Sequence, residues 1–528
     1  GYLKSLAQRL LLHNQHRIRL VMKPDGQLRK EQEQAERNRL NAIKDSLNEE
    51  DEQAIIDSAI ALKQRQEIRE DLDVLPKVGI EDVPTEVAYP RKYDTQTSPL
   101  SLTSYNAGTN GLVYQQTVIP MPELSDEQMD LLPIYSACAT EMGVGARNYQ
   151  QTQLWQSSIV GSYSASVSVQ TDRQNLEKLR GNITFSCKGL ARNQQAMSDL
   201  MMESLEFVRF DELSRLRELI AQIRTQRESS IVSGGHVLAM TAASSGLSAN
   251  AFLNQRWRGM TGIILLKRLD EGLNTDNGLQ RLSSQLQQIH HQVLQQQRQY
   301  LLVAEEQHLQ HFTSNIQHSF ANDQNDSTID NSIRYSPDLQ TVNHCWTANT
   351  QVSFCAKAYP TVASAHPDAP PLTVLGGVLR NGYLHRSIRE QGGAYGGGAS
   401  QDSQSGTFRF FSYRDPRIDG TLDDFDKSVN WLLNHPLDYV NIEEAILGVI
   451  ANMDKPSSPA NEAIQAFHDN LNGRTRDSIA RFREKVLRVN EADLKRVAAH
   501  YLKPNNVQTA VITNSDLAAN SPLTVVSD

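Results

Sequence analysis

The sequence predicts an α+β protein with two duplicated domains, each an antiparallel sheet with helices packed on one face, preceded by a helical hairpin linker. The chain has 528 residues, above the roughly 250–300 at which a single hydrophobic core stops growing. Segments with two-residue and with helical apolar periods alternate along it. The order of strand, long helix, strands and helical run occurs twice, in units of roughly 200–240 residues, which indicates a duplication.

The composition excludes some classes of partner. The chain is 39% hydrophobic and 21% charged, with a net charge of −9. A dedicated nucleic-acid binder needs a local Lys/Arg surplus to neutralise phosphates. No stretch approaches the ~18 consecutive apolar residues that span a bilayer. We therefore expect neither a nucleic acid nor a membrane as partner.

The first 78 residues look like a connecting region. Residues 17–23 (RIRLVMK) alternate as a strand but have no local partner, so we interpret 1–26 as the tail of a truncated second domain. The segment 29–70 is rich in Glu, Gln, Lys and Arg with spaced apolar residues, which predicts two antiparallel helices. We assign 27–78 as the helical hairpin linker. Gly1 stands in place of an initiator Met, so a targeting signal would lie upstream.

Residues 79–325 are expected to form the third domain of such a protein. The segment 111–120 (GLVYQQTVIP) is predicted as a strand, and Ser125 begins a capping box for a helix to about Met142. The remaining predicted strands are 159–170 and 181–188, and the predicted helices are 193–207, 211–229, 237–243, 251–269 and 277–298.

Residues 326–528 are expected to form a fourth domain with the same element order. Its predicted strands are 352–358, 407–413 and 507–513. Its predicted helices are 369–388, 422–433, 442–453, 457–471, 474–486 and 491–501. A glycine-rich turn at 392–398 is expected between the first helix and the second strand.

The cysteines and histidines show no metal-binding pattern. Four cysteines in 528 residues are too few for a disulfide scaffold, and none has C-x-x-C spacing. We expect buried free thiols, which favours a reducing compartment. No two histidines have the four-residue spacing that places two imidazoles on one helical face, and the three-residue pair His308/His311 is interpreted as a solvated face.

The segment 382–398 (GYLHRSIREQGGAYGGG) carries the strongest local signal. His385 and Arg389 lie four residues apart on a predicted helix and so share a face. Gly392 and Gly393 would end that helix, and Tyr395 projects beyond them. A guanidinium, a phenol and bare backbone can together bind peptide carbonyls. The alternative is a simple helix end with Arg389 as a surface ion-pair residue. A phosphate-binding loop is disfavoured because neither Walker A nor G-x-G-x-x-G is matched.

Several segments, in order along the chain, resemble the pitrilysin/insulysin (inverzincin) family of zinc metallopeptidases, and most closely its presequence-protease branch. They are LHRSIREQGGAYGGG followed by FRFFSYRDP, HRIRLVMKPD at 16–25, and SSGLSANAFLNQRWRGM at 244–260. The glycine-rich block alone is moderately specific, whereas the ordered set covers nearly the whole chain.

The resemblance implies a fold and a set of site residues. In this family two halves enclose a chamber, and H-x-x-E-H in the first domain binds zinc and activates water. Arg389 and Tyr395 would contact the substrate and the transition state, and His385, Gly392 and Gly393 would be substrate-binding. No residue of this chain is expected to bind metal, since the helix at 131–143 has Ile134, Ala137 and Cys138 where ligands and base would stand.

The resemblance implies the C-terminal half of a zinc endopeptidase that degrades unstructured oligopeptides. Its N-terminal half would be a partner within the same polypeptide, and this chain alone would be inactive. The alternative is a non-catalytic peptide-binding subunit or core-type homologue of the family. A nucleotide-binding protein is a third reading, which lacks a phosphate Lys or Mg²⁺ ligands. The compartment is expected to be cytoplasmic for a bacterial protein, or the mitochondrial matrix or another organelle for a eukaryotic one.

Overall fold

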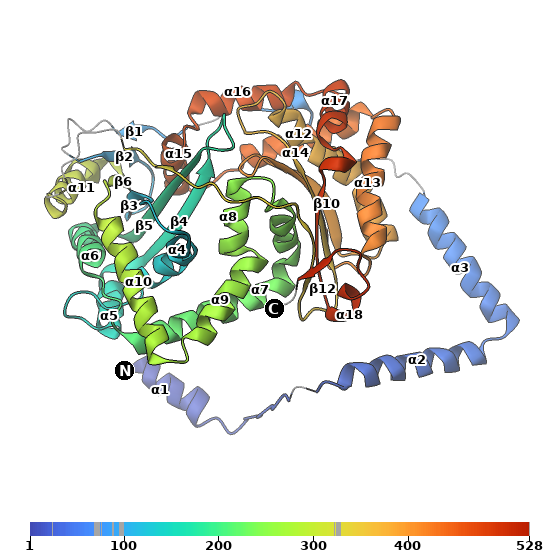
Figure 1. Ribbon diagram of the computed structural model, residues 1–528, viewed down its shortest axis with the longest axis horizontal. Helices are drawn as coiled ribbons and strands as arrows, with labels where there is room; N and C mark the ends of the chain where they lie inside the picture. Colours follow the sequence, from blue (N-terminus) through green and yellow to red (C-terminus); the bar gives the residue numbers. More distant parts are fainter. Residues whose placement is uncertain are drawn as a thin grey trace. The chain divides into compact units, whose positions relative to one another are not determined.

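The computed structural model describes residues 1–23, 25–67, 74, 76–86, 89–93, 100–321, 323 and 329–526. The chain divides into two compact units, Gly1–Val78 and Gly79–Asp528, which are considered separately (Figure 1). This division falls where the linker is predicted to end. The further boundary near residue 325, and the assignment of each segment to a domain, stay predictions.

The first unit is helical where the linker was predicted. α2 (Leu28–Ser46) and α3 (Glu49–Glu67) follow the short α1 (Tyr2–Ala7) and a wide helical turn, η1 (Gln8–Leu12). Their apolar side chains are exposed, for example Leu40 at 51% and Ile55 at 56%, so they do not pack as the antiparallel pair we expected.

The strand predicted at 17–23 is wrong, because no strand pairing occurs there. Ile18 is 96% exposed and Met22 86% exposed. A strand needs hydrogen-bonded neighbours, and the described residues of this unit offer none.

The first sheet of the second unit has the strand order β1-β2-β6-β3-β5-β4, with β7 on β5. Adjacent strands run antiparallel except β2 and β6, which run parallel. Its strands are β1 (Lys92–Tyr93), β2 (Leu102–Asn106), β3 (Leu112–Pro120), β4 (Val160–Thr171), β5 (Leu179–Leu190), β6 (Gln299–Ala304) and β7 (Ser332–Ile333). Its neighbouring helices are α4 (Asp126–Ala139), α5 (Tyr149–Ile159), α6 (Gln194–Phe207), α10 (Asp276–Leu294) and α11 (Glu306–Ser319).

The second sheet has the order β10-β11-β9-β12-β8-β13. Its strands are β8 (Asn343–Thr347), β9 (Phe354–Pro360), β10 (Gly396–Asp402), β11 (Thr407–Tyr413), β12 (Gln508–Thr513) and β13 (Thr524–Val526). β8 runs parallel to both β12 and β13. Both sheets are therefore mixed, which corrects the expectation of purely antiparallel sheets.

The two sheets share one topology. Read in chain order, β2, β3, β4, β5 and β6 occupy the places that β8, β9, β10, β11 and β12 occupy in the second sheet, and the parallel pair is the same in both. α4 and α12 (Ala369–Leu379) both follow the second of these strands. The duplication expected from element order is thus present in the described part of this unit.

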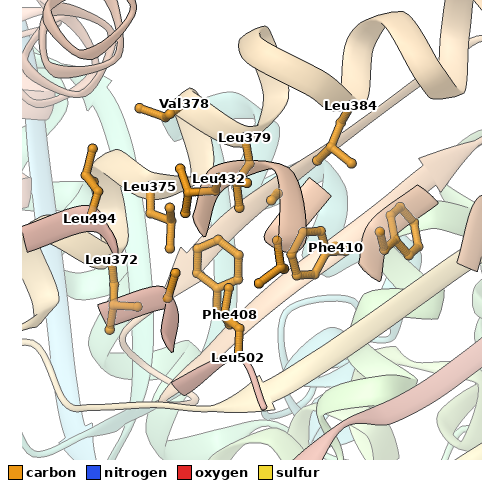
Figure 2. Close-up of a cluster of buried hydrophobic side chains, with 14 of the residues drawn as sticks. Leu372, Leu375, Val378, Leu379, Leu384, Phe408, Phe410, Leu432, Leu494 and Leu502 are labelled. Carbon is orange, nitrogen blue, oxygen red and sulfur yellow. The ribbon is translucent and has the colours of Figure 1, made fainter. Parts of the chain in front are cut away.

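The largest core covers one face of the second sheet (Figure 2). Phe408 and Phe410 of β11 pack against Leu372, Leu375 and other side chains of helices that follow β9. These helices are α12, η5 (Arg380–Gln391), α13 (Asp419–Asn434), α14 (Tyr439–Met453), α16 (Arg476–Leu487) and α17 (Glu491–Tyr501).

The opposite faces are also covered, each by a helix from the other half of the unit (Figure 1). Leu238 and Ala239 of α7 (Leu213–Ser244) pack on Phe354 of the second sheet. Phe467 of α15 (Pro459–Leu471) packs on Leu301 of the first sheet. The expectation of helices on one face only is therefore incomplete.

Two helix predictions need correction along the same stretch. α7 is one helix with non-helical backbone at Gly234, where two helices were predicted. The single helix predicted at 251–269 is divided at Gly259 into α8 (Ala249–Arg258) and α9 (Met260–Gly272). Among the described residues, no helix combines the length and the apolar character that crossing a bilayer would require.

Candidate functional site

The candidate site lies where η5 ends and the second sheet begins. The helix predicted to carry His385 and Arg389 is confirmed, but over Arg380–Gln391 it has the wider turns of a π-helix. Such segments are rare and often occur at functional sites. Leu384 and Ile388 are buried on its inner side, whereas His385 and Arg389 are exposed.

Gly392 and Gly393 make the turn that follows. The Gly393 N–H donates to the Arg389 carbonyl at 3.2 Å, and the Ala394 N–H donates to the Ile388 carbonyl at 3.1 Å. Gly393 has φ +80°, where only glycine is relaxed. A Cβ on Gly392 would lie 1.9 Å from the Arg417 Nη2. Both glycines are thus needed for the chain to reverse here, and their role in binding substrate stays a prediction.

This turn brings Tyr395 beside Arg389. The Arg389 guanidinium carbon lies 5.9 Å from the centre of the Tyr395 ring, within the range of a cation–π contact. The Tyr395 N–H donates to the Tyr413 carbonyl at 3.0 Å. The ring is 66% exposed, so its hydroxyl is accessible to a ligand. The two residues that the sequence selected therefore form one exposed pair.

His385 is not part of this pair. Its Nδ1 lies 3.4 Å from the Glu390 Oε1. Among the described residues, no hydrogen bond or ring contact joins it to Arg389 or Tyr395. Its assignment as substrate-binding stays a prediction.

The glycines after Tyr395 form a strand and not a turn, contrary to our expectation. β10 begins at Gly396 and pairs antiparallel with β11. A Cβ on Gly397 would lie 2.9 Å from the Ile388 Cγ2, so the missing side chains let η5 pack closely on the strand. The glycine run is therefore explained by packing.

Sequence reasoning missed three further residues at this site. The Tyr413 ring stands edge-on to the Tyr395 ring at 5.6 Å, and the Arg414 guanidinium carbon lies 5.3 Å from the Tyr413 ring centre. The His236 ring, from α7, lies 4.8 Å from the Tyr413 ring. Burial lowers the pKa of His236. The only sequence signal for the first two is their place in FRFFSYRDP, at the end of β11 and directly after it.

The residues at the expected metal position do not fit zinc. On α4, Cys138 is fully buried, and burial raises its pKa to about 12, so it stays a neutral thiol. Glu141 is engaged by the Arg215 Nη2 at 2.9 Å. Within the described residues, no three or more His, Cys, Asp or Glu side chains are grouped to hold a metal. We therefore derive no step through zinc in this chain.

Two family models match the chain in succession. One, described as the associated region of peptidases of family M16, subfamily C, matches residues 22–269. The other, described as "PreP C-terminal domain", matches residues 344–515. The mitochondrial presequence protease of Xenopus laevis is 27% identical over 95% of this chain and 51% of that protein. The chain belongs to the pitrilysin family, in its presequence-protease branch.

Other members of the family agree with this assignment. The mitochondrial presequence protease of Yarrowia lipolytica is 27% identical over 97% of this chain and 51% of that protein. The chain thus spans about half the length of the curated relatives it matches.

Solved structures show the same fold. A protease from Helicobacter pylori aligns with a TM-score of 0.58 at 14% identity, covering 81% of this chain and all of that chain. The "peptidase M16 inactive domain" from Pseudomonas fluorescens aligns with a TM-score of 0.54 at 12% identity, covering 81% of this chain and 98% of that chain.

Proposed function

We propose that this chain is the C-terminal half of a zinc endopeptidase that degrades unstructured oligopeptides in a closed chamber. The observation that carries the proposal is the exposed Arg389–Tyr395 pair, in a chain of the presequence-protease branch. In this proposal the N-terminal half of the polypeptide supplies the zinc, and this chain supplies substrate binding and closure.

The chemistry of the pair suits that role. A guanidinium presents several donors in a fixed fork, and a phenol presents one O–H. Both can hold a peptide carbonyl in place and stabilise the negative charge that develops on its oxygen during hydrolysis. The widened helix and the glycine turn fix the two side chains on rigid elements, which limits the reorganisation needed when a peptide binds.

Two finer expectations belong to the same proposal. This chain alone should not hydrolyse peptides, because its described residues provide no metal site. The relatives named above are mitochondrial proteins, which favours the organelle alternative for the compartment.

The first experiment measures hydrolysis of an unstructured fluorogenic peptide by the full-length protein. Arg389→Ala and Tyr395→Phe should each lower kcat/KM by at least about tenfold, the scale of a lost transition-state donor. Arg386→Ala is the matched control, because Arg386 is exposed on the same helix and should leave kcat/KM within about twofold. Near-normal kcat/KM in both variants would refute the assigned roles.

The same measurement tests the alternative, a non-catalytic peptide-binding subunit. Hydrolysis that requires H-x-x-E-H in an upstream segment of the same polypeptide supports the proposal. A protein that binds peptide without cleaving it, with zinc present, would establish the alternative instead.

A further inference from the structure

We propose that Tyr413 and Arg414 extend the candidate site, so that Arg389, Tyr395, Tyr413 and Arg414 form a row that binds a carboxylate of the peptide. We call these four side chains the arginine–tyrosine row. The inference rests on the proposed function only in taking a peptide as the ligand. It adds a second guanidinium and a chemical preference.

The row is continuous in space. The Arg389 guanidinium carbon lies 5.9 Å from the Tyr395 ring centre, the two tyrosine rings lie 5.6 Å apart at 86°, and the Arg414 guanidinium carbon lies 5.3 Å from the Tyr413 ring. The backbone ties the two ends together, because the Tyr395 N–H donates to the Tyr413 carbonyl and also to the Arg414 carbonyl at 3.3 Å.

Neither terminal guanidinium is neutralised by this chain. Among the described residues, no carboxylate lies within 4.0 Å of Arg389 or Arg414, although many other arginines have such partners. The acids adjacent in sequence are already engaged. Glu390 lies beside His385, and Asp415 is fully buried and accepts hydrogen bonds from the Thr421 hydroxyl and the Arg417 N–H.

Arg414 also has a strained backbone. Its φ is +50°, a conformation that costs a non-glycine residue about 1 kcal/mol or more. Glycine or asparagine would fill this exposed turn with less strain. Because Arg414 is exposed and forms no ion pair within the described residues, its side chain contributes little to the fold that would offset the strain. An arginine retained under strain, stacked on a ring and facing solvent, points to a ligand.

The chemistry selects a carboxylate. A guanidinium binds a carboxylate through two parallel N–H···O bonds, and stacking on an aromatic ring holds it ready to do so. In an unstructured peptide, that carboxylate comes either from an acidic side chain or from the C-terminus.

The test measures binding to the 528-residue chain by fluorescence anisotropy. Four labelled peptides share one sequence and differ only in Glu or Gln at one internal position and in a C-terminal carboxylate or amide. We expect the carboxylate forms to bind about two- to fivefold more tightly, the range of an exposed ion pair, and the difference to shrink as salt is raised. Which of the two replacements weakens binding identifies the source of the carboxylate.

Two substitutions at Arg414 separate binding from folding. Arg414→Gln should abolish the preference for the carboxylate forms, whereas the exposed control Arg386→Gln should keep it. Arg414→Gly should abolish the preference while raising Tm, because glycine relaxes the positive φ. That combination cannot result from a damaged fold.

Three outcomes would overturn the inference. They are equal binding of acid and amide peptides, a preference that survives Arg414→Gln, and no measurable binding of any peptide. If the amide peptide still binds in a way that depends on Arg389 and Tyr395, the proposed function stands and only the inference fails.

Discussion

At the residue scale, His290 shows how burial sets a charge state. Its side chain lies in the first core, and its Nδ1 is 3.0 Å from the Tyr135 hydroxyl. Burial lowers its pKa from 6.5 to about 4, with the positive charge of Arg298 acting in the same direction. The folded protein therefore holds the neutral imidazole, and the unfolded chain takes up a proton first as pH falls.

This residue predicts a pH dependence of stability. The contribution is fully present above pH 6.5 and is lost as pH falls from 6.5 towards 4, a total of about 3 kcal/mol. Denaturant unfolding at about pH 7 and about pH 4.5 should show a smaller loss of unfolding free energy in His290→Gln than in the wild type. The same substitution at the exposed His308 is the control. An identical pH slope in the wild type and His290→Gln would contradict the prediction.

At the element scale, the end of η5 determines where Tyr395 stands. Gly392 is required by space, because a Cβ would meet both the Arg417 Nη2 at 1.9 Å and the Ile388 carbonyl at 2.6 Å. Gly393 is required by its positive φ alone, since the nearest atom to its Cβ would be 3.6 Å away. Gly396 has neither constraint.

These three glycines predict a graded mutational series. Gly393→Ala should lower the unfolding free energy by about 1 kcal/mol from backbone strain, and Gly392→Ala should cost more because packing around Arg417 must move. Gly396→Ala should change it by less than about 0.5 kcal/mol. Denaturant unfolding checks the order. Equal effects at all three positions would show that the turn does not depend on these constraints.

Which elements the sequence predicts depends on how local their cause is. Ser125 begins α4 as expected, because the Gln128 N–H donates to its hydroxyl within the same turn. The strand at 17–23 and the glycine strand β10 were both misjudged. In each case tertiary pairing decides the outcome, since β10 gains β11 as a partner and 17–23 gains none among the residues that the structure describes. Glycine also has a low strand propensity.

The candidate site divides in the same way. Arg389 and Tyr395 were found from sequence because helix, glycines and tyrosine lie within one short segment. Tyr413 and Arg414 come from the end of another strand, and His236 comes from a helix of the other half of the unit. Their proximity depends on strand pairing and on the packing of α7, which no local pattern encodes.

At the scale of the whole molecule, residues 79–528 are held together by an exchange of helices. α7 covers the free face of the second sheet, and α15 covers that of the first. His468 on α15 also contacts the Gln116 Oε1 on β3 at 2.7 Å through its Nε2. Each sheet therefore depends on the other half of the unit to exclude water from one of its faces.

This exchange predicts that damage to one helix is felt by the opposite sheet. Phe467→Ala should lower the unfolding free energy by about 3 kcal/mol or more and speed hydrogen exchange in β6, where Leu301 and Val303 pack on α15. Unfolding should remain a single transition. Phe207→Ala is the control, because Phe207 is 55% exposed. The prediction fails if exchange in β6 is unchanged or if the two sheets unfold at separate midpoints.

The four cysteines have a practical consequence. All are free and buried, and burial raises the pKa of Cys138 and Cys187 to about 12, so the native surface offers nothing for a maleimide dye to modify. A cysteine introduced at an exposed position, such as Leu154 at 72% exposure, would be the single reactive thiol. Fluorophores could then be attached at chosen sites of the otherwise unaltered chain, and energy transfer between a labelled chain and a labelled peptide would report binding in real time.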